Sequence, residues 1–421
     1  MSSQKIKLAL FLAVMSPSVL ASGFSLIEQS ASGQGLSYAG AAANAEDASV
    51  MWFNPAGLSH LDGHQVIIAQ HVIVPKAAYT DSGSSTAAPS FIDGENDNGA
   101  TVGIVPNLYW KGSFGGHDLG LGINVPFGQH ISYDEDWVGR YHATETNLRT
   151  LNINPAVSKQ ITDQFSFGFG LNAQYVDLVL ENKIDNRYAG GSTDGSAKLT
   201  ADSWAFGYNF GLIYQPVATT DLGFSYRSSI THNAKGKVDY TDVVNTPTTV
   251  LEHVIDANAS STVSLPASAS FSLNQQINPR LQFLADATWT KWSDYKELII
   301  QFDSDQADLN TRQNFKDSWR LALGGAYQLN EMFKLRGGVA FDQTPISNPT
   351  NRSPRTPDAD RKWISAGLGY KINKSMNLDF AYSYLMADKA KVNYTTNDAQ
   401  YLKGSYDLDI NIFSAQFIWK Y

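Results

Sequence analysis

Apolar and polar residues alternate along many short stretches of this chain. The clearest stretch runs from Phe165 to Tyr175, with Phe, Leu, Ala and Tyr at odd positions and Ser, Gly, Asn and Gln between them. Successive side chains of a strand point to opposite faces, so such a stretch has one apolar and one polar face. Similar alternation covers residues 119–125, 151–158, 206–214, 222–226, 263–273, 319–329 and 376–384. The pattern predicts a long series of antiparallel strands.

The connections between these stretches also alternate, in length. Short polar turns are expected at 162–164, 217–220, 278–279, 330–331 and 373–374. Longer loops are expected at roughly 76–100, 129–147, 181–202, 240–259, 303–317, 344–360 and 387–404. Counting strands from about His64 to Tyr421 gives 14, an even number. These features predict an all-β fold, a 14-stranded antiparallel transmembrane β-barrel with its long loops outside the cell. A secreted β-sandwich or propeller is the alternative fold.

The last nine residues show the alternation at its strongest. Phe413, Phe417, Trp419 and Tyr421 occupy odd positions, with mostly polar residues between them. This strand is expected to place its aromatic face toward lipid. Leu408, Ile410 and Ile412 are apolar on the opposite parity, so we expect a bulge or a change of face near Ile412–Phe413. The terminal Tyr421 resembles the signal that barrel-assembly machinery reads.

The amino-terminal residues are expected to form a cleaved signal peptide. Lys5 and Lys7 precede an apolar run from Leu8 to Met15, and small residues lead to Ala21. Eight apolar residues are too few for a membrane-spanning helix, which needs about 20. Removing residues 1–21 changes the formal charge from −9 to −11, because two lysines are lost.

Composition narrows the possible functions further. The chain contains 20 Tyr, 21 Phe and 9 Trp, which suits the aromatic girdles of a barrel, and its acidic charge argues against nucleic acid as a partner. It has no Cys, and its eight His form no recognisable motif with Ser or Asp. We therefore expect no enzymatic activity, no cofactor and no metal site. Phosphate loops and nucleotide motifs are absent from the sequence.

Residues 22–63 break the alternation and are rich in Gly, Ala and Ser. A segment of this composition before the first strand suits a plug, or hatch, inside the barrel, because its small residues allow tight packing. Asn54, Pro55, Ala56 and Gly57 contain turn chemistry and are assigned to this hatch. The barrel itself is expected to occupy residues 64–421.

Several segments in this order resemble the FadL family of outer-membrane transporters. They are 22–24, 33–40, 53–58, 125–128, 137–141, 315–317, 341–345 and 357–361, which span nearly the whole mature chain. The resemblance implies a 14-stranded barrel plugged by the hatch. It also implies uptake of long-chain fatty acids or, in one branch, of aromatic hydrocarbons such as toluene and xylene. We expect a monomer in contact with outer-membrane lipid and lipopolysaccharide.

An outer loop is the first candidate for ligand capture. Within residues 240–259, Val250, Leu251, Val254 and Ile255 would share one side of a helix that follows Pro247. An apolar stripe on a polar loop can bind a hydrophobic ligand. The alternative is that the stripe packs against the 181–202 loop.

Further candidates follow from the resemblance. Phe24 is expected to line a deeper pocket, and ligand binding is expected to displace it. Lys316 matches the family lysine that pairs with a carboxylate. The position of the family arginine falls near Leu180, but no Arg stands there and the nearest cations are Lys183 and Arg187. This departure from the family pattern strengthens the aromatic-hydrocarbon alternative. Lys316 could instead pair with Asp317 or Asp358.

The resemblance also implies that the ligand leaves sideways, through a gap in the third strand. Pro126, Phe127 and Gly128 are the candidates for this gap, because proline removes a ladder donor and glycine weakens a strand. Gly120–Gly122 is an alternative position, and so is an ordinary strand end at Pro126. A general diffusion porin and an outer-membrane lipase remain the alternatives from other functional classes.

Overall fold

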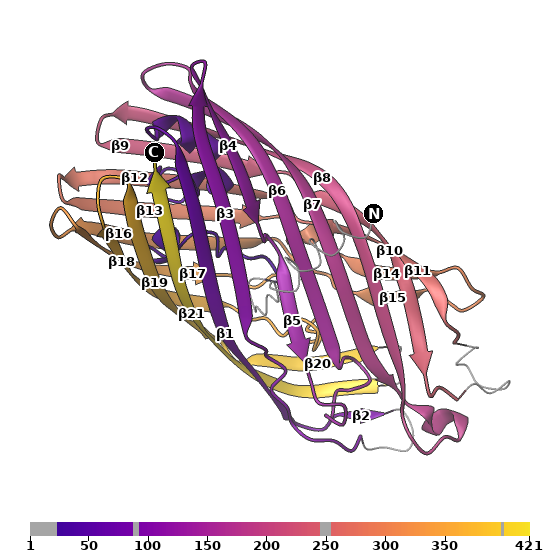
Figure 1. Ribbon diagram of the computed structural model, residues 1–421. Helices are drawn as coiled ribbons and strands as arrows, with labels where there is room; N and C mark the ends of the chain where they lie inside the picture. The colour runs from indigo at the N-terminus through magenta and orange to yellow at the C-terminus, as the bar shows by residue number, and fades with distance from the viewer. Residues whose placement is uncertain (1–22, 87–91, 245–253, 397–399) are drawn as a thin grey trace.

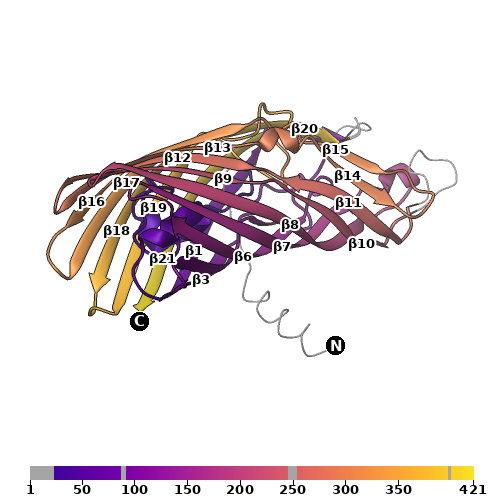
Figure 2. The same ribbon diagram turned by 90° about the horizontal axis from the view of Figure 1, so that it is seen from above.

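The strands close into a tilted barrel in the computed structural model (Figures 1 and 2). The structure describes residues 23–86, 92–244, 254–396 and 400–421; the predicted signal peptide lies outside them. Fourteen strand segments pair antiparallel in a circle, in the order β1, β3, β4, β6, β7, β8, β9, β12, β13, β16, β17, β18, β19, β21. Pairing of β21 with β1 closes the circle, from Gln65 opposite Lys420 to Asp81 opposite Gly404. The predicted fold class is confirmed.

The strand segments have the following bounds: β1 Gln65–Asp81, β2 Ser85–Thr86, β3 Gly103–Phe114, β4 His117–Asn124, β5 Gly128–Ser132, β6 Glu145–Gln160, β7 Phe165–Ile184, β8 Gly195–Val217, β9 Thr220–Arg227, β10 Ile230–Thr241, β11 Ala257–Leu265, β12 Ser268–Asn278, β13 Leu281–Thr290, β14 Glu297–Phe302, β15 Leu309–Arg312, β16 Ser318–Gln328, β17 Phe333–Asp342, β18 Arg361–Lys371, β19 Met376–Ala387, β20 Ala390–Thr396 and β21 Gln400–Lys420. No helix among these described ranges is long and apolar enough to cross a membrane.

Several strands extend into the ranges that the sequence predicted as loops. The ladder between β7 and β8 continues to Ile184 opposite Gly195, within the expected 181–202 loop. The ladder between β20 and β21 likewise crosses most of the expected 387–404 loop. These outer parts carry polar residues toward solvent, so their hydrophobic alternation is weak and they look like loops in the sequence.

The alternation predicts correctly which side chains face outward. On β7, Phe165, Phe167 and Phe169 are exposed, whereas Ser166 and the glycines between them are buried against the interior. Outward apolar residues occur on the other strands too, including Trp319, Phe380 and Phe413. The exposed apolar surface therefore forms a belt that faces lipid.

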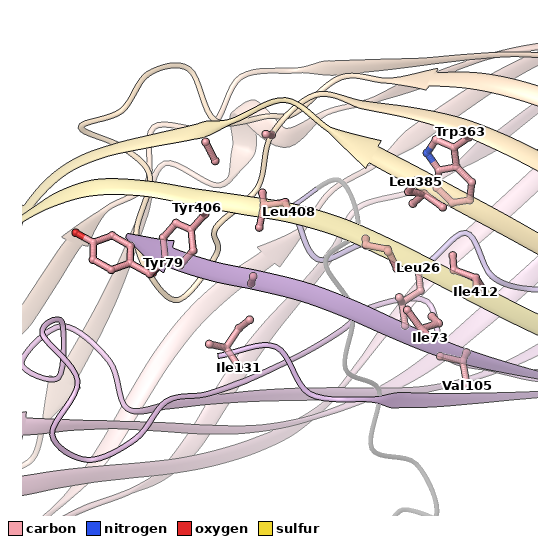
Figure 3. Close-up of a cluster of buried hydrophobic side chains, with 14 of the residues drawn as sticks. Leu26, Ile73, Tyr79, Val105, Ile131, Trp363, Leu385, Tyr406, Leu408 and Ile412 are labelled. Carbon is pink, nitrogen blue, oxygen red and sulfur yellow. The ribbon is translucent and has the colours of Figure 1, made fainter. Parts of the chain in front are cut away.

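The bulge predicted in β21 is wrong. The register with β1 runs without a shift, and every even-numbered side chain from Leu408 to Ile418 stays on the inner face. Leu408, Ile410 and Ile412 are buried in a core that includes Leu26 of the plug and Ile73 of β1 (Figure 3). These inward positions are apolar because they pack against interior segments of the chain, so no change of face is needed.

The amino-terminal residues fill the lumen at one end of the barrel (Figure 2). They form α2 (Ala31–Gln34), α3 (Val50–Phe53) and the 3-10 helix η1 (Pro55–His60), joined by tight turns. Asn54 lies where α3 meets η1, and its amide Nδ2 donates to the backbone oxygens of Leu212 and Phe224 at 3.0 and 3.3 Å. Pro55, Ala56 and Gly57 are buried against the barrel wall. These contacts fix the plug to the barrel wall.

Candidate functional site

The third strand of the barrel is interrupted between β4 and β5. The ladder from β3 to β4 ends at Leu108 opposite Ile123, and β5 pairs only with β6 on its other side among the named strands. Within the described part of the chain, residues 103–107 of β3 thus lack a ladder partner toward the third strand. Val125, Pro126 and Phe127 occupy the interruption, because a proline cannot donate to a ladder.

Residues 24–29 of the plug close this interruption from inside. The Leu26 amide donates to the Pro126 oxygen at 2.8 Å, and the Gly128 amide donates to the Phe24 oxygen at 3.0 Å. On the other side, the side-chain amide Nδ2 of Asn107 in β3 donates to the backbone oxygen of Glu28 at 2.9 Å. The segment thus pairs through its backbone with the interrupted third strand and is held to β3 by the side chains of Asn107 and Tyr109, which satisfies backbone groups that would otherwise be unpaired.

Phe24 lies in an aromatic cluster in the middle of the lumen. Its ring centroid is 4.8 Å from that of Trp292, 5.6 Å from Tyr295 and 6.1 Å from Phe127. Phe315 packs on Trp292 and Tyr295, at 5.7 and 5.2 Å. Tilted and edge-on pairs of this kind favour close packing. The cluster separates a cavity toward the outer loops from a second cavity toward the plug.

The outer cavity is strongly apolar. It comprises about 960 Å³ of space, part of which is open to solvent, with Phe24 in its lining. Most of its wall is aliphatic: Leu148, Val176, Leu178, Leu180, Leu199, Val263, Leu265, Leu298 and Ile300. These side chains come from β6, β7, β8, β11 and β14. This apolar lining suits a ligand with a long hydrocarbon portion.

Arg355 brings a positive charge to the edge of this cavity. It belongs to the loop between β17 and β18, and it is the only Arg or Lys among the described residues that line the cavity. Its guanidinium donates to the backbone oxygens of Glu145 and Glu181 at 2.8 and 3.1 Å, and to Thr146 and Asn182 side chains. No carboxylate forms an ion pair with it in the described part of the chain. Burial lowers the pKa of Arg355 to about 10, so it remains charged at neutral pH.

The second cavity, on the plug side of the aromatic cluster, is larger and more polar. It contains about 1110 Å³ and is bordered by Ser25, Leu26 and Ile27. Pro126 and Phe127 of the interrupted strand also line it. Its remaining wall includes Ser225, Arg227, Ser268, Ser270, Asp286, Thr288, Arg320 and Asp342. The plug segment thus lies between an apolar chamber and a chamber that adjoins the interruption.

The predicted site residues occupy different places. Phe24 and Leu180 line the apolar cavity. Lys183 lies outside its lining and pairs with Glu135, with Nζ and Oε2 2.7 Å apart. Lys316 is exposed and is not among the residues of the cavity wall.

The capture loop is described only in part. Val250 and Leu251 lie outside the described residues, whereas Val254 is half-buried and Ile255 is exposed just before β11. The sequence did not point to Arg355, because an arginine in a polar loop is normally solvated. Its position depends on the loop folding back into the barrel mouth.

A closed β-barrel with a buried plug, an apolar chamber and a lipid-facing belt defines an outer-membrane channel. The model for the family "Outer membrane protein transport protein (OMPP1/FadL/TodX)" matches residues 12–421. The chain therefore belongs to this family of outer-membrane transporters for hydrophobic compounds. It is accordingly a transport channel of the Gram-negative outer membrane, and not an enzyme.

Individual relatives agree with this assignment. The long-chain fatty acid transport protein of Escherichia coli O6:H1 is 28% identical, and the alignment covers 94% of each chain. The structure of a Pseudomonas aeruginosa FadL homologue superposes with a TM-score of 0.87 at 24% identity, covering 94% of this chain and 99% of that one. The Ralstonia pickettii toluene transporter TbuX gives a TM-score of 0.68 at 19% identity, covering 93% and 98%. These two structures support the fold.

Proposed function

We propose that this protein takes up long-chain fatty acids through the outer membrane. The observation that carries this choice is Arg355, a half-buried cation at the edge of an otherwise aliphatic cavity, without a carboxylate partner among the described residues. Burying an unpaired charge is costly unless a ligand supplies the opposite charge. A fatty acid supplies both a carboxylate for Arg355 and a hydrocarbon chain for the aliphatic wall. The name of the Escherichia coli relative supports the same ligand class.

The proposed route begins at the outer loops, where Val250, Leu251, Val254 and Ile255 capture the ligand. The acid then enters the apolar cavity, with its chain against Leu180 and Phe24. Each methylene that leaves water for this cavity contributes about 0.8 kcal/mol. Movement of residues 24–29 connects the cavity with the interruption at Pro126, Phe127 and Gly128, and the ligand leaves there into the membrane.

Uptake of aromatic hydrocarbons is the second candidate function. TbuX is named a toluene transporter, and this chain shares its fold. A neutral hydrocarbon would fill the aliphatic cavity but would leave Arg355 without a counter-charge. A general diffusion porin is a weaker candidate, because the plug fills one end of the lumen. Arg355 thus distinguishes the proposed ligand from a hydrocarbon.

The test compares oleate with its methyl ester on the detergent-purified protein. In Arg355→Gln, oleate binding should weaken at least tenfold, because a hydrogen bond to a charged group contributes about 1.5–3 kcal/mol. Binding of methyl oleate should change less than about twofold, since the ester carries no charge. Calorimetry or displacement of a fluorescent fatty acid gives both affinities.

Lys316→Gln is the matched control, because it removes an exposed cation outside the cavity. It should leave both affinities unchanged. Equal losses for oleate and its ester in Arg355→Gln would instead assign Arg355 a purely structural role. Wild-type protein that binds toluene more tightly than oleate would favour the hydrocarbon function.

A further inference from the structure

Three lysines gather on the outer part of the barrel, away from the cavities described above. Lys389 precedes β20, Lys391 lies in β20 and Lys403 lies in β21. All three are exposed, and together they line an open groove of about 1170 Å³. Residues 348–350 form another part of its wall, where the amide of Asn393 donates to the Pro349 oxygen at 2.9 Å.

The groove faces outward from the barrel. Lys391 alternates with the buried Ala390 and Val392, and Lys403 lies next to the buried Leu402. Val392 and Leu402 belong to the interior core, so the lysines point to the opposite face. A groove on this face meets the lipid layer around the barrel rather than the channel mouth.

Its height places the groove beyond the acyl chains. The outward aromatic residues of β19 continue to Tyr384, which pairs in register with Asn411 of β21, and the outward positions of β21 from Asn411 to Lys403 are all polar. Lys403 lies eight residues beyond Asn411 along β21, and Lys391 pairs in register with Ser405. At about 3.3 Å per residue and a tilt near 40°, this corresponds to roughly 15–20 Å above the belt. Phosphorylated sugars of lipopolysaccharide occupy this layer.

Neighbouring acids offset the charge of the groove only in part, through the attraction between Lys389 and Asp407. The chain has a formal charge of −9, yet none of the three lysines forms an ion pair with a described residue. The acids nearby already have partners, since Asp407 lies 2.7 Å from Lys76 and Asp388 lies 3.6 Å from Lys362. Three ammonium groups that form no ion pair with a described residue surround one open groove, and such a group of charges matches a phosphate.

We propose that this groove binds the phosphate groups of the lipopolysaccharide core. The site is separate from the transport route, because none of its residues lines either lumenal cavity. Binding there holds a lipopolysaccharide molecule against the β20–β21 hairpin. Phosphate contacts made by lysines weaken with salt, and so should this association.

The test measures lipopolysaccharide binding to the full-length protein in detergent, by native mass spectrometry and by light-scattering titration. Binding of lipopolysaccharide with a phosphorylated core should weaken at least tenfold in the variant Lys389→Gln/Lys391→Gln/Lys403→Gln. Lipopolysaccharide that lacks core phosphates should bind wild type and variant equally weakly. Oleate binding should stay unchanged, which also shows that the variant is folded.

The variant Lys235→Gln/Lys237→Gln/Lys296→Gln is the control, because it removes three exposed charges elsewhere on the barrel. It should bind phosphorylated lipopolysaccharide as wild type does. Equal losses in both variants would overturn the site in favour of general charge attraction. Full retention by the groove variant would overturn it as well. Displacement of lipopolysaccharide by an equimolar amount of inorganic phosphate would identify a site for free anions instead.

Discussion

Single glycines in the barrel wall determine how closely the plug can approach. Gly338 of β17 faces the plug, and a Cβ built at this residue would lie 2.1 Å from the backbone carbon and oxygen of Leu36. Gly223 and Gly168 meet the plug backbone at Ala42 and Ala56 in the same way, at 2.1 and 2.3 Å. At these positions, the lack of a side chain allows two backbones to touch.

Gly338→Ala should therefore loosen the plug. The added methyl group meets backbone rather than a flexible side chain, so the plug must shift, and overpacking of this kind costs about 1–3 kcal/mol. Urea unfolding in lipid vesicles should show the loss. Gly337→Ala is the matched control on the same strand, because nothing lies within 4 Å of its Cβ position. Equal stability of the two variants would contradict tight seating of the plug.

Residue patterns predicted the wall of this molecule better than its interior. The outward face of β21 was predicted from its odd-numbered aromatics, because lipid imposes one chemistry on every outward position. Inward positions contact segments that are distant in sequence. Leu408 and Ile412 therefore suggested a bulge in β21, although they are core residues of the inner face. Arg355 was missed for the same reason: only the fold of its loop brings it to the cavity.

Among the structural elements, the interrupted third strand and the plug segment that closes it are the parts most suited to move. Residues 24–29 are held by two backbone hydrogen bonds to the interruption, by side-chain hydrogen bonds such as that from Asn107, and by the apolar contacts of Phe24 and Leu26. The body of the plug, in contrast, is held by polar contacts to many strands, such as Ser37 to Ser365 at 2.7 Å and Ala42 to Ser272 at 3.0 Å. Movement limited to residues 24–29 requires fewer contacts to break than release of the whole plug.

A disulfide between Ser25→Cys and Phe127→Cys should lock this segment and abolish uptake. The two residues form an antiparallel bridge flanked by the hydrogen bonds from Leu26 and Gly128. Opposite residues in a pair of this type have Cα atoms about 4.5 Å apart, within the range that a disulfide spans. The natural chain contains no Cys, so no other bond can form. Uptake of labelled oleate by cells should fall at least tenfold and return with reductant.

Phe127→Cys alone controls for loss of the aromatic ring and should not respond to reductant. A fully cross-linked protein that still transports oleate would contradict lateral exit through the third strand. The family resemblance implied a gap in the third strand, and proline chemistry made Pro126 a candidate for its position beside Gly120–Gly122. It could not predict the closure, because the pairing of residues 24–29 with it depends on contacts between distant parts of the chain.

At the scale of the whole molecule, the barrel combines a polar inner wall with a plug that occupies it. Inward groups on the wall bind the plug directly: Gln416 accepts from the Ala31 amide at 2.9 Å, and Arg320 donates to the Ser37 oxygen at 2.7 Å. Without the plug, these groups would face an open lumen that water can fill, as in larger porins. The inner wall that binds the plug could thus line a conducting pore once the plug is removed.

Removal of residues 23–60 should convert the closed channel into a steadily conducting pore. The intact protein in a planar bilayer should show no steady open current, because α2, α3 and η1 occupy the lumen and hold it through the wall contacts. A shift in gel mobility on heating checks that the shortened barrel is folded. A steady open current from the intact protein would contradict the plugged state, whereas a folded shortened barrel that stays closed would assign the closure to the outer loops. Fatty-acid specificity should be lost together with the plug, since Phe24 and the aromatic cluster it completes form the floor of the apolar cavity.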